Sequence, residues 1–181
     1  MTPRRARRRR AKSAAAPKSS LPPDPGSQLA QFTSLSAFLT GFDAAELHGT
    51  GMMQVYFDLI PSIIGPEYFG RLLSRWSNIY IRGAGDEPLL EELVTTGLLE
   101  DDTLGPLARN LIALWYLGMW NQLPGDWRNV HGAWSGDTTF IVSPQSYTSA
   151  LVWKALHSHP PGAKQPGYGS WALPPEEARP R

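Results

Sequence analysis

The sequence predicts a small, irregular all-α domain of about five to six helices, with a long aromatic loop and extended N- and C-terminal tails. Apolar residues recur at spacings of three and four through most of the chain, as on one face of a helix. Capping residues and Gly-Pro pairs divide this pattern into segments. A short extended segment is indicated only at Thr138–Val142.

Composition divides the 181 residues into one domain and two tails. Residues 1–28 are rich in Arg, Ala, Ser and Pro, which is typical of a disordered basic arm. Residues 29–158 form the predicted helical domain. Residues 159–181 form a tail rich in Pro, Gly and aromatic residues.

The first half of the domain predicts four helices. The first carries apolar residues from Phe32 to Leu39 and stops at Gly41. Asp43 is expected to cap a second helix that runs to Pro61 with Gly49 and Gly51 inside it. A third helix opens at Gly65-Pro66, and a shorter fourth follows Asp86.

The fifth helix is predicted from about Gly105-Pro106 to Trp120, and it is apolar on nearly all sides, which indicates burial. Residues 121–142 interrupt the helical pattern with Pro124 and three glycines but carry Trp127 and Trp134, which favours an ordered loop. Ser143, followed by Pro144, is a natural start for a last helix that runs to His157.

The charge is distributed unevenly although the net charge is only +1. Residues 1–20 hold eight Lys and Arg and no acid, so residues 21–181 carry nine basic against 16 acidic groups, or about −7. The arm is compatible with a solvated tail, with a phosphate-binding segment, or with a degenerate export signal that begins with Arg4-Arg5. No apolar stretch of signal-peptide length follows these arginines. The alternative function is a nucleic-acid- or protein-binding module that uses this arm. Nucleic-acid binding is disfavoured, because an acidic body would repel phosphates.

Residue types that carry chemistry give no convincing site in this sequence. The absence of Cys excludes disulfides, thiolate metal sites and Cys nucleophiles. His157 and His159 could supply two metal ligands, but a metal site needs three or four, and we favour a role at a helix end. Serines without a nucleophile motif and solvated carboxylate pairs do not indicate catalysis. We therefore expect a chain that is not an enzyme and binds no cofactor or metal itself.

The aromatic residues instead suggest a protein that binds a partner. Of the seven Trp, Trp76, Trp115 and Trp120 fit the core, whereas Trp127 and the other three occupy positions where an interface is plausible. Tail prolines restrict the backbone before binding, and tail rings can anchor it in pockets. The predicted partner-binding residues are Trp134, Trp153, Pro160, Pro161, Tyr168 and Trp171.

Several segments in a fixed order resemble one bacterial family. They are LIALWYLGMW at 111–120, VSPQSY at 142–147, LVWK at 151–154, HPPG at 159–162, PGYGSW at 166–171 and, near the start, FTSLSAFLTG at 32–41. Together they are similar to the small subunit of membrane-associated, FAD-dependent sugar and polyol dehydrogenases, the sorbitol dehydrogenase small-subunit family. Gluconate, glucose and fructose dehydrogenases carry similar chains.

The resemblance implies a non-catalytic accessory subunit that supports folding, export or assembly of a larger partner. In that family the large subunit carries FAD and oxidises the sugar, and a cytochrome c subunit passes electrons onward. A periplasmic location, with membrane association only through the complex, would follow. A cytoplasmic location is the alternative, because the apolar part of an export signal is missing after Arg4-Arg5.

Overall fold

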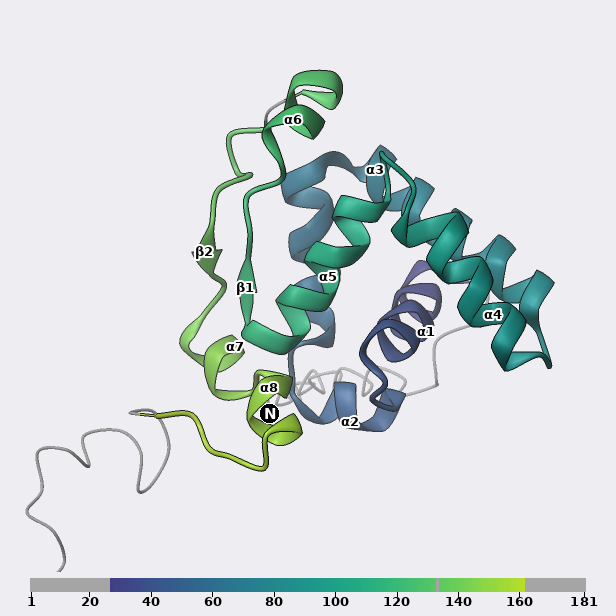
Figure 1. The fold of residues 1–181 in the computed structure, drawn as a ribbon. Coiled ribbons are helices and arrows are strands. Elements are labelled where there is room, and N and C mark those ends of the chain that lie inside the picture. Colours follow the sequence, from purple (N-terminus) through teal and green to yellow (C-terminus); the bar gives the residue numbers. More distant parts are fainter. Residues whose placement is uncertain (1–26, 133, 162–181) are drawn as a thin grey trace, which may run out of the picture.

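A computed structural model describes residues 27–132 and 134–161 of the chain, and these are mostly helical. The all-α prediction is confirmed (Figure 1). The helices are α1 Gln28–Thr40, α2 Ala44–Gly49, α3 Met53–Gly83, α4 Glu87–Val94, α5 Gly105–Leu117, α6 Gly125–His131, α7 Pro144–Thr148 and α8 Leu151–Ala155, and a π-helical turn, η1, covers Thr95–Leu99. Two short strands, β1 Met119–Trp120 and β2 Phe140–Ile141, complete the elements.

Helix α5 occupies the middle of the molecule, with α1 and α3 packed against it (Figure 1). The chain leaves α5 through β1, passes through α6 at one end of the molecule, and returns as β2 beside β1. The strands are antiparallel, with Met119 opposite Ile141 and Trp120 opposite Phe140. This ribbon brings the chain back to α7 and α8, which lie at the end opposite α6 and close to α2 (Figure 1).

The core is contributed mainly by α1, α3 and α5, and its largest members are aromatic. Trp76, Trp115 and Trp120 are almost fully buried, as predicted. Tyr56 of α3 meets Trp115 edge to face, with ring centroids 4.8 Å apart. Such an arrangement is favourable beyond the area it buries, by about 0.5–1.5 kcal/mol. The aromatic content of this chain thus serves its own core to a large extent.

The predicted second helix is wrong in its extent, because α2 ends at Gly49 and does not run to Pro61. The hydroxyl of Thr50 donates to the Leu47 carbonyl over 2.7 Å and accepts from the Met52 amide over 3.1 Å. One side chain therefore closes α2 and holds the chain where α3 begins. The residues assigned to the later part of that helix belong to α3, which contains Pro61 without ending there.

The start predicted at Gly65-Pro66 corresponds to a kink inside α3. Gly65 has φ 81° and ψ 150°, which is far from helical values and disfavoured for residues with a Cβ. Pro66 then sits at the first position of the following helical half, where its missing N–H is no cost. Figure 1 shows the change of direction along α3.

Candidate partner-binding surface

Trp153, Pro160 and Pro161 are brought together where the described part of the chain ends. The indole Nε1 of Trp153 donates to the Tyr147 carbonyl over 2.6 Å. The Tyr147 ring meets Trp153 edge to face at 5.3 Å, and its hydroxyl donates to the Pro161 carbonyl over 3.2 Å. Pro160 is buried and Pro161 exposed. The tail therefore begins by lying against α7 and α8.

This organisation differs from the single helix predicted from Ser143 to His157. Ala150 has ψ 134°, an extended value that separates α7 from α8. Ala150 and Leu151 are both buried, and α8 packs against α5. The Tyr147 carbonyl accepts from the Ala150 amide and from the Trp153 indole. This carbonyl therefore keeps hydrogen-bond donors although the helix is interrupted between α7 and α8. Burial of Leu151 beside α5 is a tertiary contact, and it favours two short helices over one long one together with the local indole bond from Trp153 to Tyr147.

Ser143 does cap the beginning of α7, as predicted. Its side chain accepts from the Ser146 amide over 3.0 Å, and the Ser146 hydroxyl accepts from the Ser143 amide over 2.9 Å. The fully buried Ser146 hydroxyl also lies 2.7 Å from the Gly118 carbonyl, to which it donates. This reciprocal cap fixes the N-terminus of α7 against the C-terminus of α5.

Gly118 is required at this junction for two reasons. Its φ of 69° lies in the left-handed region and closes α5. A Cβ at this position would lie 2.3 Å from the Ser146 carbonyl oxygen, far inside contact distance. The close approach of α7 to α5 therefore depends on a residue without a side chain.

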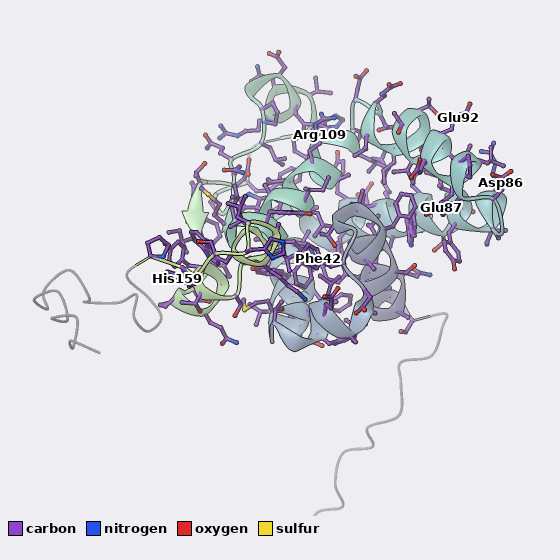
Figure 2. The ribbon with its side chains drawn as sticks, turned by 60° about the horizontal axis from the view of Figure 1, so that its bottom comes forward. Phe42, Asp86, Glu87, Glu92, Arg109 and His159 are labelled. Atoms are coloured by element: carbon purple, nitrogen blue, oxygen red, sulfur yellow. The ribbon has the colours of Figure 1, made fainter. Side chains whose placement is uncertain are left out.

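A cavity of about 470 Å³ lies between α2 and the α7–α8 segment. Trp153 and Pro160 contribute to its wall, together with Thr50 and Ser149. Glu46 of α2 and Lys154 of α8 form an ion pair across it, and Lys154 lies 5.5 Å from the centre of the Phe42 ring. Hydrogen bonds from Lys154 and from the Asp43 amide lower the pKa of Glu46. Figure 2 shows Phe42 and His159 on this side of the molecule.

Two residues after the end of α8, the backbone is left-handed at a residue other than glycine. His157 has φ 48°, while the Ser158 amide donates to the Trp153 carbonyl over 2.7 Å. This bond from Ser158 is typical of a helix end that normally places glycine at the His157 position. His157 thus serves a helix end, and within residues 27–132 and 134–161 no group of three His or acidic residues could hold a metal ion.

Trp134 follows α6 in the chain and contacts Trp127 of that helix. Figure 1 shows α6 at the end of the molecule opposite α7 and α8. Trp134 is half-buried and packs on Tyr68 and Trp127, with ring centroids 5.5 and 5.6 Å away. His131 completes the cluster, since its Nδ1 lies 3.2 Å from the Tyr68 hydroxyl. The predicted residues therefore occupy two separate places, and Tyr68, Trp127 and His131 join Trp134 in the second.

Assignment of Trp127 to an interface is wrong. Its side chain is 4% exposed, and its indole donates to the Thr103 carbonyl over 2.8 Å. The sequence did not reveal this, because Trp127 belongs to α6, a short helix inside the region predicted as a loop. Tyr168 and Trp171 lie outside the described residues.

Asp137 was missed by the sequence analysis and organises the aromatic loop. It is 0% exposed, and its carboxylate accepts from the Trp120 indole over 2.9 Å and from the Leu123 amide over 3.1 Å. The Arg128 Nε lies 3.5 Å from its second oxygen, which is an ion pair without good hydrogen-bond alignment. The sequence did offer one signal for this role: Asp137 directly follows Gly136 in a Trp-rich loop, and an Asp in a turn commonly bonds to nearby backbone.

The pairing of Glu46 with Lys154 was also missed, and here the sequence offers no local signal because 108 residues separate the partners. Tyr147 stood inside a segment used for the family resemblance, but its bond to Pro161 required the fold. No helix within the described ranges is long and apolar enough to cross a membrane.

Comparison of the chain with known protein families, with curated proteins and with solved structures found no match. The class of protein therefore has to be argued from the residues and the geometry.

Proposed function

We propose that this chain is a non-catalytic accessory subunit of an FAD-dependent sugar or polyol dehydrogenase complex. It would support the folding, export or assembly of a larger subunit that carries FAD and the catalytic site. A cytochrome c subunit would be a further component. The proposal rests on the resemblance stated above and on the way the resembling segments are arranged in space.

The observation that supports the proposal is that four resembling segments within the described residues, 32–41, 111–120, 142–147 and 151–154, form one contiguous body. Segment 111–120 covers most of α5 and β1, and segment 142–147 meets it where Ser146 donates to the Gly118 carbonyl. Segment 151–154 forms most of α8, which packs on α5. Segment 32–41 belongs mainly to α1, and the Tyr116 hydroxyl donates to the Thr40 carbonyl over 2.8 Å. Segments far apart in sequence thus share contacts, as expected for parts of one scaffold.

The buried polar groups support a scaffold role for a different reason. Asn110 exchanges two hydrogen bonds with the Asn121 backbone, at 2.5 and 3.0 Å. Asp137 and Ser146 likewise bond to the backbone, and the Thr40 hydroxyl donates to the Ser36 carbonyl over 2.7 Å. These groups are engaged in holding loops and helix ends, so we assign FAD binding and sugar oxidation to the partner.

The surface formed by Trp153, Pro160 and Pro161 is our choice for the contact with the large subunit. It holds a cavity beside aromatic and proline side chains, and the tail with Tyr168 and Trp171 continues from it. Large rings near the centre of an interface contribute most of its binding energy. Location in the periplasm, with membrane association through the complex, belongs to the proposal; the cytoplasm is the alternative.

The experiment is co-expression of the full chain, carrying an affinity tag, with a large flavin-binding oxidoreductase identified among the neighbouring genes. We expect the two chains to elute together, with flavin absorbance and dye-linked sugar oxidation in the same fraction. The tagged chain expressed by itself should show neither. Stoichiometric FAD on this chain alone, or a flavoprotein that elutes separately and is fully active, would contradict the proposal.

Two substitutions locate the contact. Trp153→Ala should reduce the co-eluting flavoprotein at least tenfold, because it removes a central ring. Val55→Ala, at a part-exposed apolar side chain on α3, is the control and should leave the yield unchanged. Trp134→Ala tests the cluster near α6 as the contact instead. A lower yield of co-eluting flavoprotein in this variant alone would place the interface at the α6 end.

A further inference from the structure

An apolar groove of about 400 Å³ lies between the first turns of α1 and the last turns of α3. Ala30 and Gln31 line one side, and Trp76, Tyr80 and Ile81 line the other. Trp76 is buried and forms the floor, with the Tyr80 ring 5.5 Å from it. Tyr80 is 50% exposed and Ile81 72% exposed, so apolar surface remains uncovered by the described residues. Exposed apolar surface of this kind commonly marks a binding site.

The position of the groove points to its occupant. Ser27 caps α1 by accepting from the Ala30 amide over 3.2 Å, so the preceding residues join the fold within one turn of the groove. Leu21-Pro22-Pro23-Asp24-Pro25 stands immediately before this point. A polyproline II segment rises about 3.1 Å per residue, so five residues span roughly 12 Å. Residues 21–25 end two residues before Ser27, and Ala30 and Gln31, three and four residues after it, line the groove together with Tyr80 and Ile81.

The chemistry of the segment matches the groove. Proline-rich segments dock in grooves lined by aromatic rings, because their backbone is already ordered and loses little entropy on binding. Leu21 offers an aliphatic side chain for the apolar floor, and Pro22 and Pro23 offer rigid rings for the Tyr80 face.

Charge complementarity extends the match beyond the groove. Helix α4 begins six residues after Ile81. Its N-cap residue Asp86 and its residues Glu87 and Glu92 are acidic, and Figure 2 shows them along one side of the molecule. Asp86 accepts from the Leu89 amide at the start of this helix, which fixes its place beside the end of α3. The arm ahead of Leu21 holds eight Lys and Arg and no acid. The electrostatic attraction between this basic arm and the acidic residues at α4 is strongest at low salt.

We infer that residues 21–25 of this chain dock in the groove between α1 and α3, with the arginine arm lying toward the acidic α4. In this state the arm covers Tyr80 and Ile81 and shields its own cationic charge from phosphates. The inference does not depend on the proposed function, since it concerns contacts within one chain.

Cysteine cross-linking tests the contact directly, because the chain has no Cys of its own. The full chain carrying Leu21→Cys and Ile81→Cys is treated at high dilution with a short bis-maleimide, and the intramolecular product is followed by mass spectrometry. Positions 21 and 81 belong to one chain, so they can also meet and react without any docking. The reaction rate is therefore compared with that of a variant in which the groove is disrupted. Tyr80→Ser in the same background should slow the reaction at least fivefold, and Arg82→Ser, at an exposed neighbour, should leave it unchanged.

Two further measurements complete the test. Pro22→Gly with Pro23→Gly should slow the reaction similarly, because the preordered backbone is lost, and raising the salt concentration should slow it further. A rate that Tyr80→Ser changes by less than twofold would overturn the inference. Products that form only between two chains would also overturn it, and would assign the groove to a second copy.

Discussion

Asp137 is the residue on which the aromatic loop depends most. Its carboxylate is fully buried, accepts from the Trp120 indole and the Leu123 amide, and faces Arg128, whose side chain is 30% exposed. Removal of one partner from a buried charged network leaves the others unpaired, which costs about 3–5 kcal/mol. We expect Asp137→Ala to lower the free energy of unfolding by about 3 kcal/mol in a urea titration. Asp126→Ala, at an exposed acid on α6, is the control and should change it by less than about 0.5 kcal/mol.

His157 offers a stabilising substitution. A left-handed backbone at a residue with a Cβ costs roughly 1–2 kcal/mol, although glycine gives part of this back through the entropy of the unfolded chain. With φ at 48°, His157→Gly should therefore raise the free energy of unfolding by about 0.5–1 kcal/mol. Ser158→Gly, next to it, should give no gain. A loss of stability in His157→Gly would show that the imidazole makes a contact that outweighs the backbone strain.

Among the elements, the turn between η1 and α5 contains a carboxylate that gives stability a pH dependence. Burial opposes ionisation of Asp101, but hydrogen bonds from the Leu104 and Thr103 amides and the nearby Arg75 outweigh it and lower its pKa. A pKa lower in the folded than in the unfolded state stabilises the fold above the ordinary carboxyl value, and this contribution is lost as the pH falls below it.

We therefore expect the stability difference between the native chain and Asp101→Asn to shrink as the pH falls. The difference should be full at pH 6 and reduced at pH 3, on either side of the ordinary pKa of 3.8. Asp102→Asn, one residue along, serves as the control. A difference that stays constant between these two pH values would show that Asp101 acts through packing and not through its charge.

The junction between α5 and α7 depends on Gly118. Gly118→Ala forces a methyl group into the Ser146 carbonyl and requires a strained φ, so the two helices must separate. We expect a loss of about 2–4 kcal/mol in the free energy of unfolding, as for overpacking combined with backbone strain. Gly125→Ala, at a position with no atom within 4 Å of the added methyl, should be neutral. Equal stability of the two variants would contradict this account of the junction.

The elements also show what sequence patterns can predict. The helix starts at Glu87, Gly105 and Pro144 were predicted from capping residues and prolines, which act within one turn. The division of residues 143–157 into α7 and α8 could not be predicted in this way, because it depends on Leu151 entering the core beside α5. Local signals favour a helix there, and tertiary packing decides where it breaks.

The candidate surface was also predictable only in part, because residue types are local signals whereas the surface is formed by tertiary packing. Trp153 and Pro160 stood out by residue type, and they do lie together at one cavity. Trp134 stood out equally, but it follows α6, which lies at the opposite end of the molecule. Glu46 and Lys154 form an ion pair although they are far apart in the sequence, and no local pattern predicts such a contact. Residue chemistry can mark a partner-binding side chain, but only the fold shows which marked side chains share a surface.

For the whole molecule, the prediction concerns the tail that continues beyond Pro161. If Trp171 anchors the large subunit, Trp171→Ala should weaken association by about 2–4 kcal/mol and raise the dissociation rate of the complex. The melting temperature of the isolated chain should stay unchanged, since the ring would contribute nothing to the domain itself. A lower melting temperature with an unaltered complex lifetime would place this ring on the chain's own helices.

The kink at Gly65 has a consequence for how the molecule opens. A continuous helix of the length of α3 would protect its amides from hydrogen exchange as one unit, but the break interrupts the ladder of hydrogen bonds in its middle. The half before Gly65 holds Tyr56 against α5, and the half after it carries Trp76 and ends against Leu90 of α4. Local opening of one half therefore need not propagate into the other, so deuterium can enter the two halves at independent rates.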